Sequence, residues 1–407
     1  MLKAIGGNMT MVKFKNRELI LNVIKNNGAV SRVDIAHKLQ LTPASITILV
    51  NDMIKEGFIK ELGLLEYEEK RSGRKKILID IDYSYKYAMG INIEPELINI
   101  GVSNIKGDIV ASRRFNTDKL LTPQGLLSQI SSECMNILWK ENIMKDKILG
   151  VGVGIVGLVD KINGISKHAY GLWNEEVQVK KILEESIGTR VIVDNNVRAL
   201  ALGEIDYQSN EDMSNVLFVK YGPGVGSAII IDNEIYYGAN NYSGEIGHTI
   251  VNYYGEMCRC GRKGCLETVA SRSVIIDKTK KQFSEKNMPE LYKLCEGNIQ
   301  SIDLGNICRA AENGDDAVLK IIEEAIFYMS VAIANAVSLY DPHNVILYGE
   351  AFKYNIIVDK LKDYMKEFII NRDTNKFISV SKLTYKSNYI GGIALALREF
   401  FYNTGGM

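Results

Sequence analysis

The chain has 407 residues, of which 46% are hydrophobic and 24% are charged, a composition typical of a globular protein rather than a disordered one. At roughly 150 residues per domain, this length predicts two or three domains. The net charge is zero, but residues 1–80 hold 14 Lys and Arg against 9 Asp and Glu, so the N-terminal part is basic and the remainder acidic. This asymmetry suits a polyanionic partner for the N-terminal part, although an ordinary solvated surface gives similar counts.

The sequence contains no stretch typical of a membrane span or a secretory signal. The longest apolar run, residues 148–159, is shorter than the about 20 residues that a membrane helix needs. Residues 1–16 lack the apolar segment of a signal peptide. We therefore expect a cytoplasmic protein with no membrane partner, in which the six cysteines are reduced or bind a metal.

The N-terminal part predicts three helices joined by short turns. The first is expected over residues 14–30. Ser31 is a fitting N-cap for the second, and Thr42 followed by Pro43 begins a third that ends near Glu56. The expected buried stripe of the third helix consists of Ile46, Leu49, Val50 and Met53.

Two helices separated by a short turn form a DNA-reading unit, and the start of the second enters the major groove. Small hydroxyl and methyl side chains there suit contacts with base edges or phosphates, although the hydroxyls could also serve only as helix caps. These residues are Thr42, Ala44, Ser45 and Thr47. A predicted hairpin follows at once, with strands at residues 58–61 and 77–80 and five cations in residues 70–76, and this basic wing favours the DNA-binding interpretation. Its expected DNA contacts are Arg71, Arg74, Lys75 and Lys76.

From residue 85 onward, the pattern predicts two similar α/β lobes with a cleft between them. The first lobe has expected strands at residues 87–93, 97–103, 108–115, 148–154 and 190–194, and a helix at 123–141. The second has expected strands at 215–221, 226–232, 234–237 and 344–348, and long helices across 304–339. We expect a winged helix-turn-helix domain at residues 1–82, a first lobe at 83–195 and a second lobe at 196–407, whose last helix, 391–402, returns to the first lobe. Neither a Walker A motif nor a GxGxxG that opens a helix occurs.

One histidine and three clustered cysteines form a candidate zinc site. They are His248, Cys258, Cys260 and Cys265. Tetrahedral Zn²⁺ accepts three thiolates and one imidazole with no open position, so we expect a structural role. Glycines between the cysteines permit the tight turns that bring thiolates together. The alternative is a set of free thiols on a loop.

The segment around this cluster, residues 244–267, strongly resembles the signature of the ROK family, named for repressors, open reading frames and kinases. The resemblance covers essentially the whole chain, including the turns at residues 152–160, 193–196, 222–226 and 391–392. It implies an α/β protein in which a winged helix-turn-helix precedes a two-lobed, actin-like sugar-kinase fold of the ATPase type. The winged head is typical of the repressor branch, whose members resemble repressors of xylose, glucose and N-acetylglucosamine genes.

The resemblance also implies a monosaccharide in the cleft. The matching residues are Gly157, Asn195, Asn196, Glu245, His248 and Glu267. Carboxylates and amides can each bind vicinal hydroxyls, and His248 can bind zinc through one ring nitrogen and a hydroxyl through the other. Trp173 and Asn174 are further candidates for bordering the ring, with plain packing equally open for Trp173.

Three features on the nucleotide side depart from the kinases of the family. The catalytic aspartate of the kinases corresponds to Asn196, whose amide cannot take the proton of a hydroxyl. The aspartate that organises Mg²⁺ corresponds to Asn92, and Glu94 and Glu96 beside it would repel phosphates. Pro223 stands where the kinases usually carry a hydroxyl. These departures predict a protein that is not an enzyme.

Three functions are therefore weighed. The favoured one is a repressor of carbohydrate-utilisation genes that binds an inverted repeat of operator DNA as a homodimer or homotetramer and changes its DNA affinity when a monosaccharide closes the cleft. The second is a ROK sugar kinase with residual activity that has acquired a head. The third is a constitutive DNA-binding regulator with a purely structural body. The first is favoured because the sugar-side residues are present while the ATP-side residues are replaced.

Overall fold

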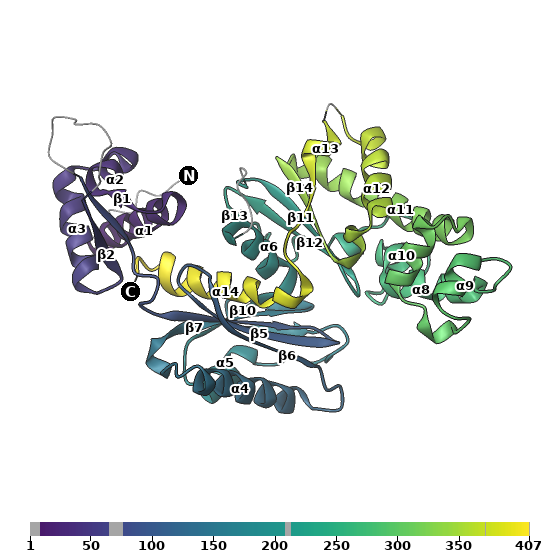
Figure 1. Ribbon diagram of the computed structural model, residues 1–407, viewed down its shortest axis with the longest axis horizontal. Helices are drawn as coiled ribbons and strands as arrows, with labels where there is room; N and C mark the ends of the chain where they lie inside the picture. The colour runs from purple at the N-terminus through teal and green to yellow at the C-terminus, as the bar shows by residue number, and fades with distance from the viewer. Residues whose placement is uncertain (1–8, 65–75, 208–212, 371, 407) are drawn as a thin grey trace. The chain divides into compact units, whose positions relative to one another are not determined.

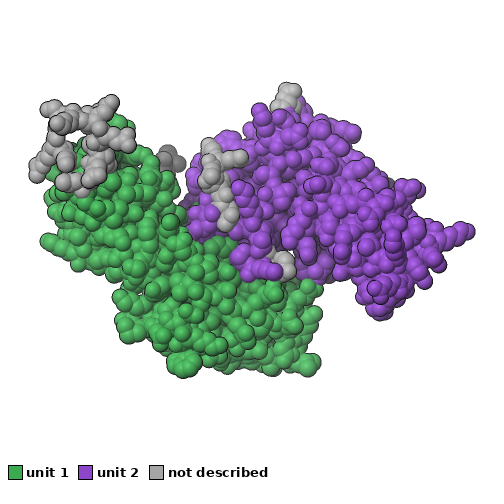
Figure 2. All heavy atoms as spheres, in the orientation of Figure 1, with its two compact units in different colours: residues 1–199, 389–407 green, residues 200–388 purple. Residues whose placement is uncertain are grey.

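The computed structural model describes residues 9–64, 76–207, 213–370 and 372–406. The chain divides into two compact units, coloured separately in Figure 2. Unit 1 comprises residues 1–199 and 389–407, and unit 2 comprises residues 200–388. In the part that the structure describes, no helix has both the length and the apolar character needed to cross a bilayer.

Unit 1 begins with a head of three helices, shown in purple in Figure 1. They are α1 (Met9–Asn27), α2 (Arg32–Leu39) and α3 (Pro43–Lys55). Both predicted caps are present, because the Ser31 hydroxyl accepts a hydrogen bond from the backbone of Asp34 and the Thr42 hydroxyl accepts one from the backbone of Ser45. The buried face of α3 consists of the predicted residues Ile46, Leu49, Val50 and Met53. The helix-turn-helix is thus confirmed.

The first helix differs from its prediction at both ends. Its described part begins at Met9 rather than at residue 14, because residues 9–13 contain neither proline nor glycine to interrupt a helix. It ends at Asn27 because Gly28 adopts a φ of +71°. Val30 then joins strand β1 (Val30–Ser31) and pairs with Ile79. The head sheet has the order β1-β3-β2, in which β2 (Ile59–Leu64) and β3 (Ile77–Ile81) are the strands of the wing.

The second part of unit 1 is a five-stranded sheet in the order β10-β7-β4-β5-β6. The first three strands along the chain are antiparallel, and the next two run parallel to β4. They are β4 (Tyr87–Ile93), β5 (Leu97–Asn104), β6 (Ile109–Asn116), β7 (Ile148–Ile155) and β10 (Val191–Asn195). Helices α4 (Pro123–Lys140) and α5 (Val179–Ile187) cover one face with an apolar core (Figure 1). The sequence pattern does not predict the hairpin of β8 (Leu158–Asp160) and β9 (Ile165–His168), whose strands are too short to show a period.

The opposite face of this sheet is covered by the C-terminal helix α14 (Tyr389–Leu397), drawn in yellow in Figure 1. The helix lies so close that a Cβ atom at Gly90 would be 2.1 Å from the carbonyl oxygen of Tyr389 and 2.5 Å from the backbone nitrogen of Ile393. Only glycine allows this approach of two backbones. The helix continues as a π-helical turn, Arg398–Tyr402. This turn also packs against the sheet, because a Cβ atom at Gly150 would lie 2.1 Å from Cδ2 of Phe400.

The end of the chain is joined to the head through Arg17. This side chain is 1% exposed, and its Nε donates to the carbonyl oxygen of Gly405 at 2.9 Å. Its two terminal nitrogens donate to the Glu56 carboxylate at 2.8 and 2.5 Å. Phe58 lies beside the guanidinium and packs edge-on against Phe401, with ring centroids 5.7 Å apart. A buried charge whose partners are all present fixes the elements that supply them, here the end of α3 and the end of the chain.

Unit 2 repeats the strand order of the first sheet. Its sheet has the order β13-β12-β11-β14-β15, again with three antiparallel strands followed by two parallel ones. The strands are β11 (Val216–Tyr221), β12 (Val225–Ile231), β13 (Glu234–Ile235), β14 (Asn344–Tyr348) and β15 (Ile378–Val380). The helices are α7 (Glu267–Ala270), α8 (Arg272–Gln282), α9 (Pro289–Leu294), α10 (Leu304–Glu312), α11 (Asp316–Tyr340), α12 (Asn355–Phe368) and α13 (Thr374–Phe377), while α6 (Asn196–Tyr207) begins in unit 1 and ends in unit 2. The repetition confirms the predicted pair of α/β lobes.

Candidate functional site

The N-terminal end of α3 presents the predicted small side chains to solvent: Thr42, Ala44, Ser45 and Thr47 are all exposed. Their hydroxyls also have local partners, because Thr42 Oγ1 lies 2.9 Å from Ser45 Oγ and Thr47 Oγ1 donates to the carbonyl of Pro43 at 2.7 Å. The capping role is therefore real, while the hydroxyl oxygen of Thr47, which donates to Pro43, can still accept a hydrogen bond. A surface of small, uncharged side chains allows a helix to approach base edges closely.

The same face continues through Ile48, whose side chain is 64% exposed. An exposed aliphatic group on such a helix suits contact with a thymine methyl group. One turn further, Asn51 accepts a hydrogen bond from Arg32, which also forms an ion pair with Glu61 at 2.8 Å. The sequence analysis does not identify Ile48 as a DNA-contacting residue, although the spacing of the buried residues of α3 indicates that it is exposed. The three- and four-residue spacing of the buried positions leaves position 48 on the outer face.

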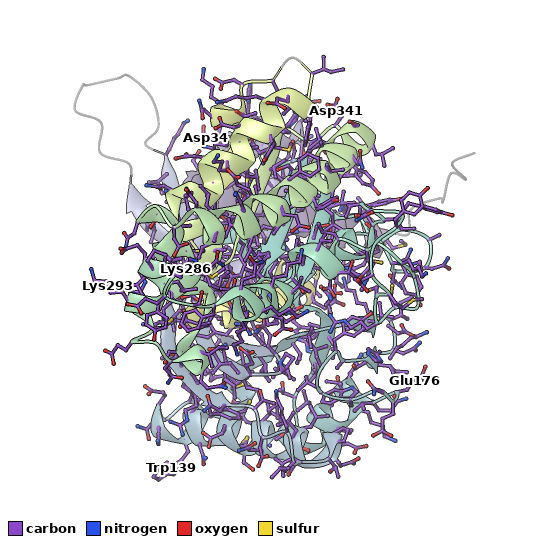
Figure 3. All side chains as sticks on the ribbon, turned by 90° about the vertical axis from the view of Figure 1, so that its right-hand side faces the viewer. Asp34, Trp139, Glu176, Lys286, Lys293 and Asp341 are labelled. Carbon is purple, nitrogen blue, oxygen red and sulfur yellow. The ribbon has the colours of Figure 1, made fainter. Side chains whose placement is uncertain are left out.

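The wing is described only at its base. Arg71, Arg74 and Lys75 lie outside the described residues. Lys76 donates to the carboxylate of Asp34, which is labelled in Figure 3, at 2.6 Å. Hydrogen bonds from Lys76 and Ser31 lower the pKa of the Asp34 carboxyl. Lys76 therefore fastens the base of the wing to α2.

The four predicted metal ligands come together in unit 2. The ligand atoms of His248, Cys258, Cys260 and Cys265 all lie within 4.8 Å of one another. The Nδ1 atom of His248 is 3.6 Å from the sulfur of Cys258, and the sulfurs of Cys260 and Cys265 are 3.6 Å apart. Zinc–sulfur bonds of about 2.3 Å place tetrahedral sulfurs about 3.8 Å apart, so this donor set and its spacing fit Zn²⁺.

The cysteine loop achieves this spacing by folding as a narrow hairpin. The backbone nitrogen of Cys258 donates to the carbonyl of Arg262 at 2.8 Å, across the turn. At Gly264, φ is +75° and a Cβ atom would lie 1.7 Å from the carbonyl oxygen of Asn252, so this position requires glycine. The chain thereby returns Cys265 to within 3.6 Å of the carbonyl oxygen of His248. Burial lowers the pKa of His248 and favours the neutral imidazole that binds metals.

Unit 2 also groups its three predicted sugar-binding residues. Glu245 directly precedes the short helical turn Ile246–His248, and its carbonyl accepts the backbone N–H of His248 at 3.0 Å. A Cβ atom at Gly247 would lie 3.0 Å from Cγ of Glu267, so the Glu267 side chain packs against this turn. Because Nδ1 of His248 faces the sulfur of Cys258, Nε2 of the same ring points away from the thiols. The imidazole can thus bind a metal on one side and a hydroxyl on the other.

The Glu267 carboxylate is held by two further contacts. Oε1 accepts the backbone N–H of Val225 at 3.2 Å, and Oε2 accepts a hydrogen bond from Arg259 at 2.8 Å. Val225 ends the turn in which the backbone nitrogen of Gly222 donates to the carbonyl of Gly224. The backbone N–H of Val225, at the end of this glycine turn, therefore already donates to the Glu267 carboxylate.

Unit 1 brings together Gly157, Asn195 and Asn196. The Asn195 amide donates to the carbonyl of Gly157 at 2.9 Å, and its oxygen accepts the backbone N–H groups of Val197 and Arg198. Asn195 therefore caps α6 and fixes the turn at Gly157. This positioning role is not evident from the sequence motif alone.

Asn196 is 1% exposed, and its amide nitrogen donates to Oε1 of Glu94 at 2.9 Å. Asn92 faces Asn99 directly across β4 and β5. Both side chains are buried, and the amide nitrogen of neither has a hydrogen-bond partner among the described residues. From the sequence, Glu94 is expected only to repel the phosphates of a nucleotide. The structure shows in addition that Glu94 contacts Asn196.

Trp173 belongs to the apolar core beneath the first sheet. Its side chain is 6% exposed, and its indole nitrogen donates to the hydroxyl of Ser166 at 3.0 Å. Plain packing is therefore the correct interpretation of Trp173. Asn174 is exposed at the surface of unit 1.

Comparison with protein families and curated proteins matches almost the whole chain. A family model described as ROK family matches residues 88–399, and one described as winged helix-turn-helix DNA-binding matches residues 14–60. The chain is 29% identical over 399 residues to the protein named Xylose repressor from Caldicellulosiruptor bescii, covering 97% of this chain and 98% of that protein. It is 27% identical over 401 residues to the N-acetylglucosamine repressor of Escherichia coli O157:H7, covering 96% and 94%.

Solved structures share the fold. A ROK family transcriptional regulator, described as a homolog of the E. coli MLC protein, has a TM-score of 0.82 at 22% identity and covers 97% of this chain and 98% of that one. A ROK family glucokinase from Streptomyces griseus, in complex with glucose and AMPPNP, has a TM-score of 0.67 at 24% identity and covers 77% and 99%. The ROK model spans far more than half of the residues, both sheets and the cysteine cluster. The chain therefore belongs to the ROK family.

Proposed function

We propose that the protein is a sugar-responsive transcriptional repressor without kinase activity. One observation carries this proposal: the chain combines a winged helix-turn-helix with a ROK domain in which Asn196 stands at the position of the kinases' catalytic base. Its amide donates to Glu94 and cannot accept the proton of a sugar hydroxyl. Proteins similar over the whole length are named repressors of xylose and N-acetylglucosamine systems, which supports carbohydrate-utilisation genes as the targets.

In this proposal, α3 lies in the major groove of operator DNA. Its base-reading residues are the exposed Thr42, Ala44, Ser45, Thr47 and Ile48. The wing contacts phosphates through its cations Arg71, Arg74, Lys75 and Lys76, with Lys76 also holding the wing to Asp34. Two heads of a cytoplasmic homodimer, or of one pair within a homotetramer, read an inverted repeat whose half-sites are spaced by about one helical turn or a multiple of it.

A structural Zn²⁺ is the second part of the proposal. It would be held by the sulfurs of Cys258, Cys260 and Cys265 and by Nδ1 of His248, which together fill a tetrahedral site. When bound, the ion supplies only a structural cross-link, because no position is left for a substrate. The chain's own residues then gain their orientation from it: the His248 ring is fixed, and α7 begins two residues after Cys265 with Glu267.

The residues proposed to bind the monosaccharide effector form one group in each unit. Unit 1 supplies Gly157, Asn195 and Asn196, and unit 2 supplies Glu245, His248 and Glu267. The amide oxygen of Asn196, the carboxylate of Glu245 and Nε2 of His248 are the atoms suited to hydroxyls. The existing contacts of Asn195 and Glu267 support positioning roles for these two.

A sugar that binds one conformation of the protein more tightly than another favours that conformation, which is how a sugar would change DNA affinity. The first sheet carries α14 on its face, and the end of the chain is bonded to Arg17 and thereby to Glu56 after α3. A change in the first sheet is therefore transmitted to the base of the DNA-reading helix. We expect the sugar to release the operator.

The test is fluorescence anisotropy of the full-length protein on its own promoter DNA, at a stated salt concentration, with a panel of monosaccharides. We expect tight binding that one sugar weakens, and no ATP consumption with any sugar. Ala44→Glu should lower operator affinity about 100-fold, because it places a carboxylate against base edges and phosphates. Its melting temperature should not fall, since a glutamate near a helix N-terminus is favourable.

Ala44→Gln is the matched control, because it has nearly the same size without the charge. It should lose much less affinity than Ala44→Glu. Operator binding that no sugar alters would favour a constitutive regulator. Sugar-dependent ATP consumption would instead support a kinase.

A further inference from the structure

The turn between β4 and β5 carries the carboxylate of Glu94, which lies beside the proposed sugar contacts of unit 1. The backbone nitrogen of Glu94 donates to the carbonyl of Leu97 at 3.1 Å and closes the turn. The hydroxyl of Thr117 donates to the carbonyl of Glu94 at 2.7 Å, and the Thr117 backbone donates to Glu96 at 3.2 Å. The turn is therefore fixed from two sides, and the position of Glu94 is set by the sheet rather than by a free loop.

The side chain of Glu94 is half-buried, and Oε1 accepts the 2.9 Å hydrogen bond from Asn196. Because the amide nitrogen of Asn196 is directed at Glu94, the amide oxygen is directed elsewhere and remains an acceptor for a sugar hydroxyl. Asn196 is next to Asn195, which is bonded to Gly157. The Glu94 carboxylate thus belongs to the same group of side chains as the proposed sugar contacts of unit 1.

Two arginines next to the proposed sugar contacts form ion pairs with carboxylates of the chain. The buried Arg198 of α6 is bonded to the buried Asp194 at 3.3 Å, so its charge is balanced by a neighbouring carboxylate. In unit 2, Arg259 is likewise bonded to Glu267, one of the proposed sugar contacts. The side chains of the proposed sugar set are carboxylates, amides and the imidazole of His248, which suit hydroxyl groups, whereas a phosphate ester carries a charge of about −1.5 to −2 at neutral pH.

We propose that Glu94 is a specificity-determining residue, and that the sensor binds an uncharged monosaccharide in preference to the phosphate ester of the same sugar. The inference rests on the proposed function, because it concerns the effector of the same site. Glu94 acts in two ways. Its carboxylate accepts a hydrogen bond that orients Asn196. Its negative charge repels the phosphate group of a sugar ester that approaches the proposed sugar contacts of unit 1. The protein therefore reports the sugar before phosphorylation, and a reaction that phosphorylates the sugar removes the signal.

The experiment is isothermal titration calorimetry of the full-length protein with each free sugar of the panel and with its 5- or 6-phosphate. Wild-type protein should bind the free sugar at least about 30-fold more tightly than its phosphate. Glu94→Gln keeps an oxygen that can accept from Asn196 but removes the charge. It should narrow this ratio about tenfold, mainly by strengthening binding of the phosphate.

Glu96→Gln is the control, because Glu96 has the same charge in the same turn but is exposed, so solvent and salt screen it. Its ratio should equal that of the wild type. Equal binding of the free sugar and its phosphate by the wild-type protein overturns the inference without any variant, and an unchanged ratio in Glu94→Gln overturns the role of this residue. Absence of binding by every sugar in both forms contradicts the proposed sugar site itself, and the inference fails with it.

Discussion

Replacement of Cys258 by serine is expected to remove the bound zinc and most of the sugar affinity. The zinc content should fall from one ion per chain to near zero, because a closed tetrahedral site loses one of its four ligands. Metal-binding free energy is also folding free energy, so the melting temperature should fall by roughly 10 °C. Sugar affinity should fall by about 100-fold, since His248 and Glu267 lose the cross-link that orients them.

The measurements are metal analysis of the purified protein, thermal unfolding, and calorimetric titration with the effector sugar. Cys295→Ser is the matched control. Cys295 is another buried cysteine of unit 2, but its sulfur contacts the carbonyl of Ser301 rather than the cluster, and a serine hydroxyl can make the same donation. Its zinc content should equal that of the wild type. Full sugar affinity in a zinc-free Cys258→Ser protein would contradict the proposed role of the metal.

Replacement of Glu56 by alanine is expected to destabilise the head by about 2–3 kcal/mol and to weaken operator binding. The change leaves the guanidinium of Arg17 buried, at 1% exposure, without the carboxylate that balances it. Breaking a fully buried pair in this way costs about 3–5 kcal/mol, and the loss expected here is smaller than that because the Glu56 side chain is 39% exposed. Chemical denaturation and operator titration are the measurements.

Asp52→Ala is the control on the same helix. Asp52 is bonded to Lys13 at 2.6 Å, but both side chains are substantially exposed, so this ion pair contributes little. Its unfolding curve should overlay that of the wild type. If Glu56→Ala unfolds as the wild type does, the junction between α3 and the end of the chain does not hold the head as the structure indicates.

Local structure is where the sequence predicts best. The buried stripe of α3 follows from a spacing of three and four residues, and its N-terminal end follows from Thr42 and Pro43. The positions of most strands along the chain follow from the alternation of apolar residues. The cysteine cluster is found because a loop of closely spaced cysteines and glycines has few other physical explanations.

Contacts between distant residues are where the sequence predicts least. Arg17 and Gly405 are 388 positions apart, and no local pattern indicates that an arginine on the first helix is bonded to the end of the chain. Glu94 and Asn196 are 102 positions apart, and only the register of β4 beside β7 and β10 places them together. Asn195 shows a related limit, since its motif suggests a ligand contact while its geometry shows a helix cap.

In the proposed function, sugar and operator DNA bind to linked sites of one protein. Linkage requires that if the sugar weakens operator binding by some factor, the operator weakens sugar binding by the same factor. The most direct test is therefore to titrate the effector sugar into the full-length protein, first alone and then saturated with its operator duplex. We expect the operator-bound protein to bind the sugar more weakly, by the same factor by which the sugar weakens operator binding. Equal sugar affinity with and without the operator would contradict this linkage.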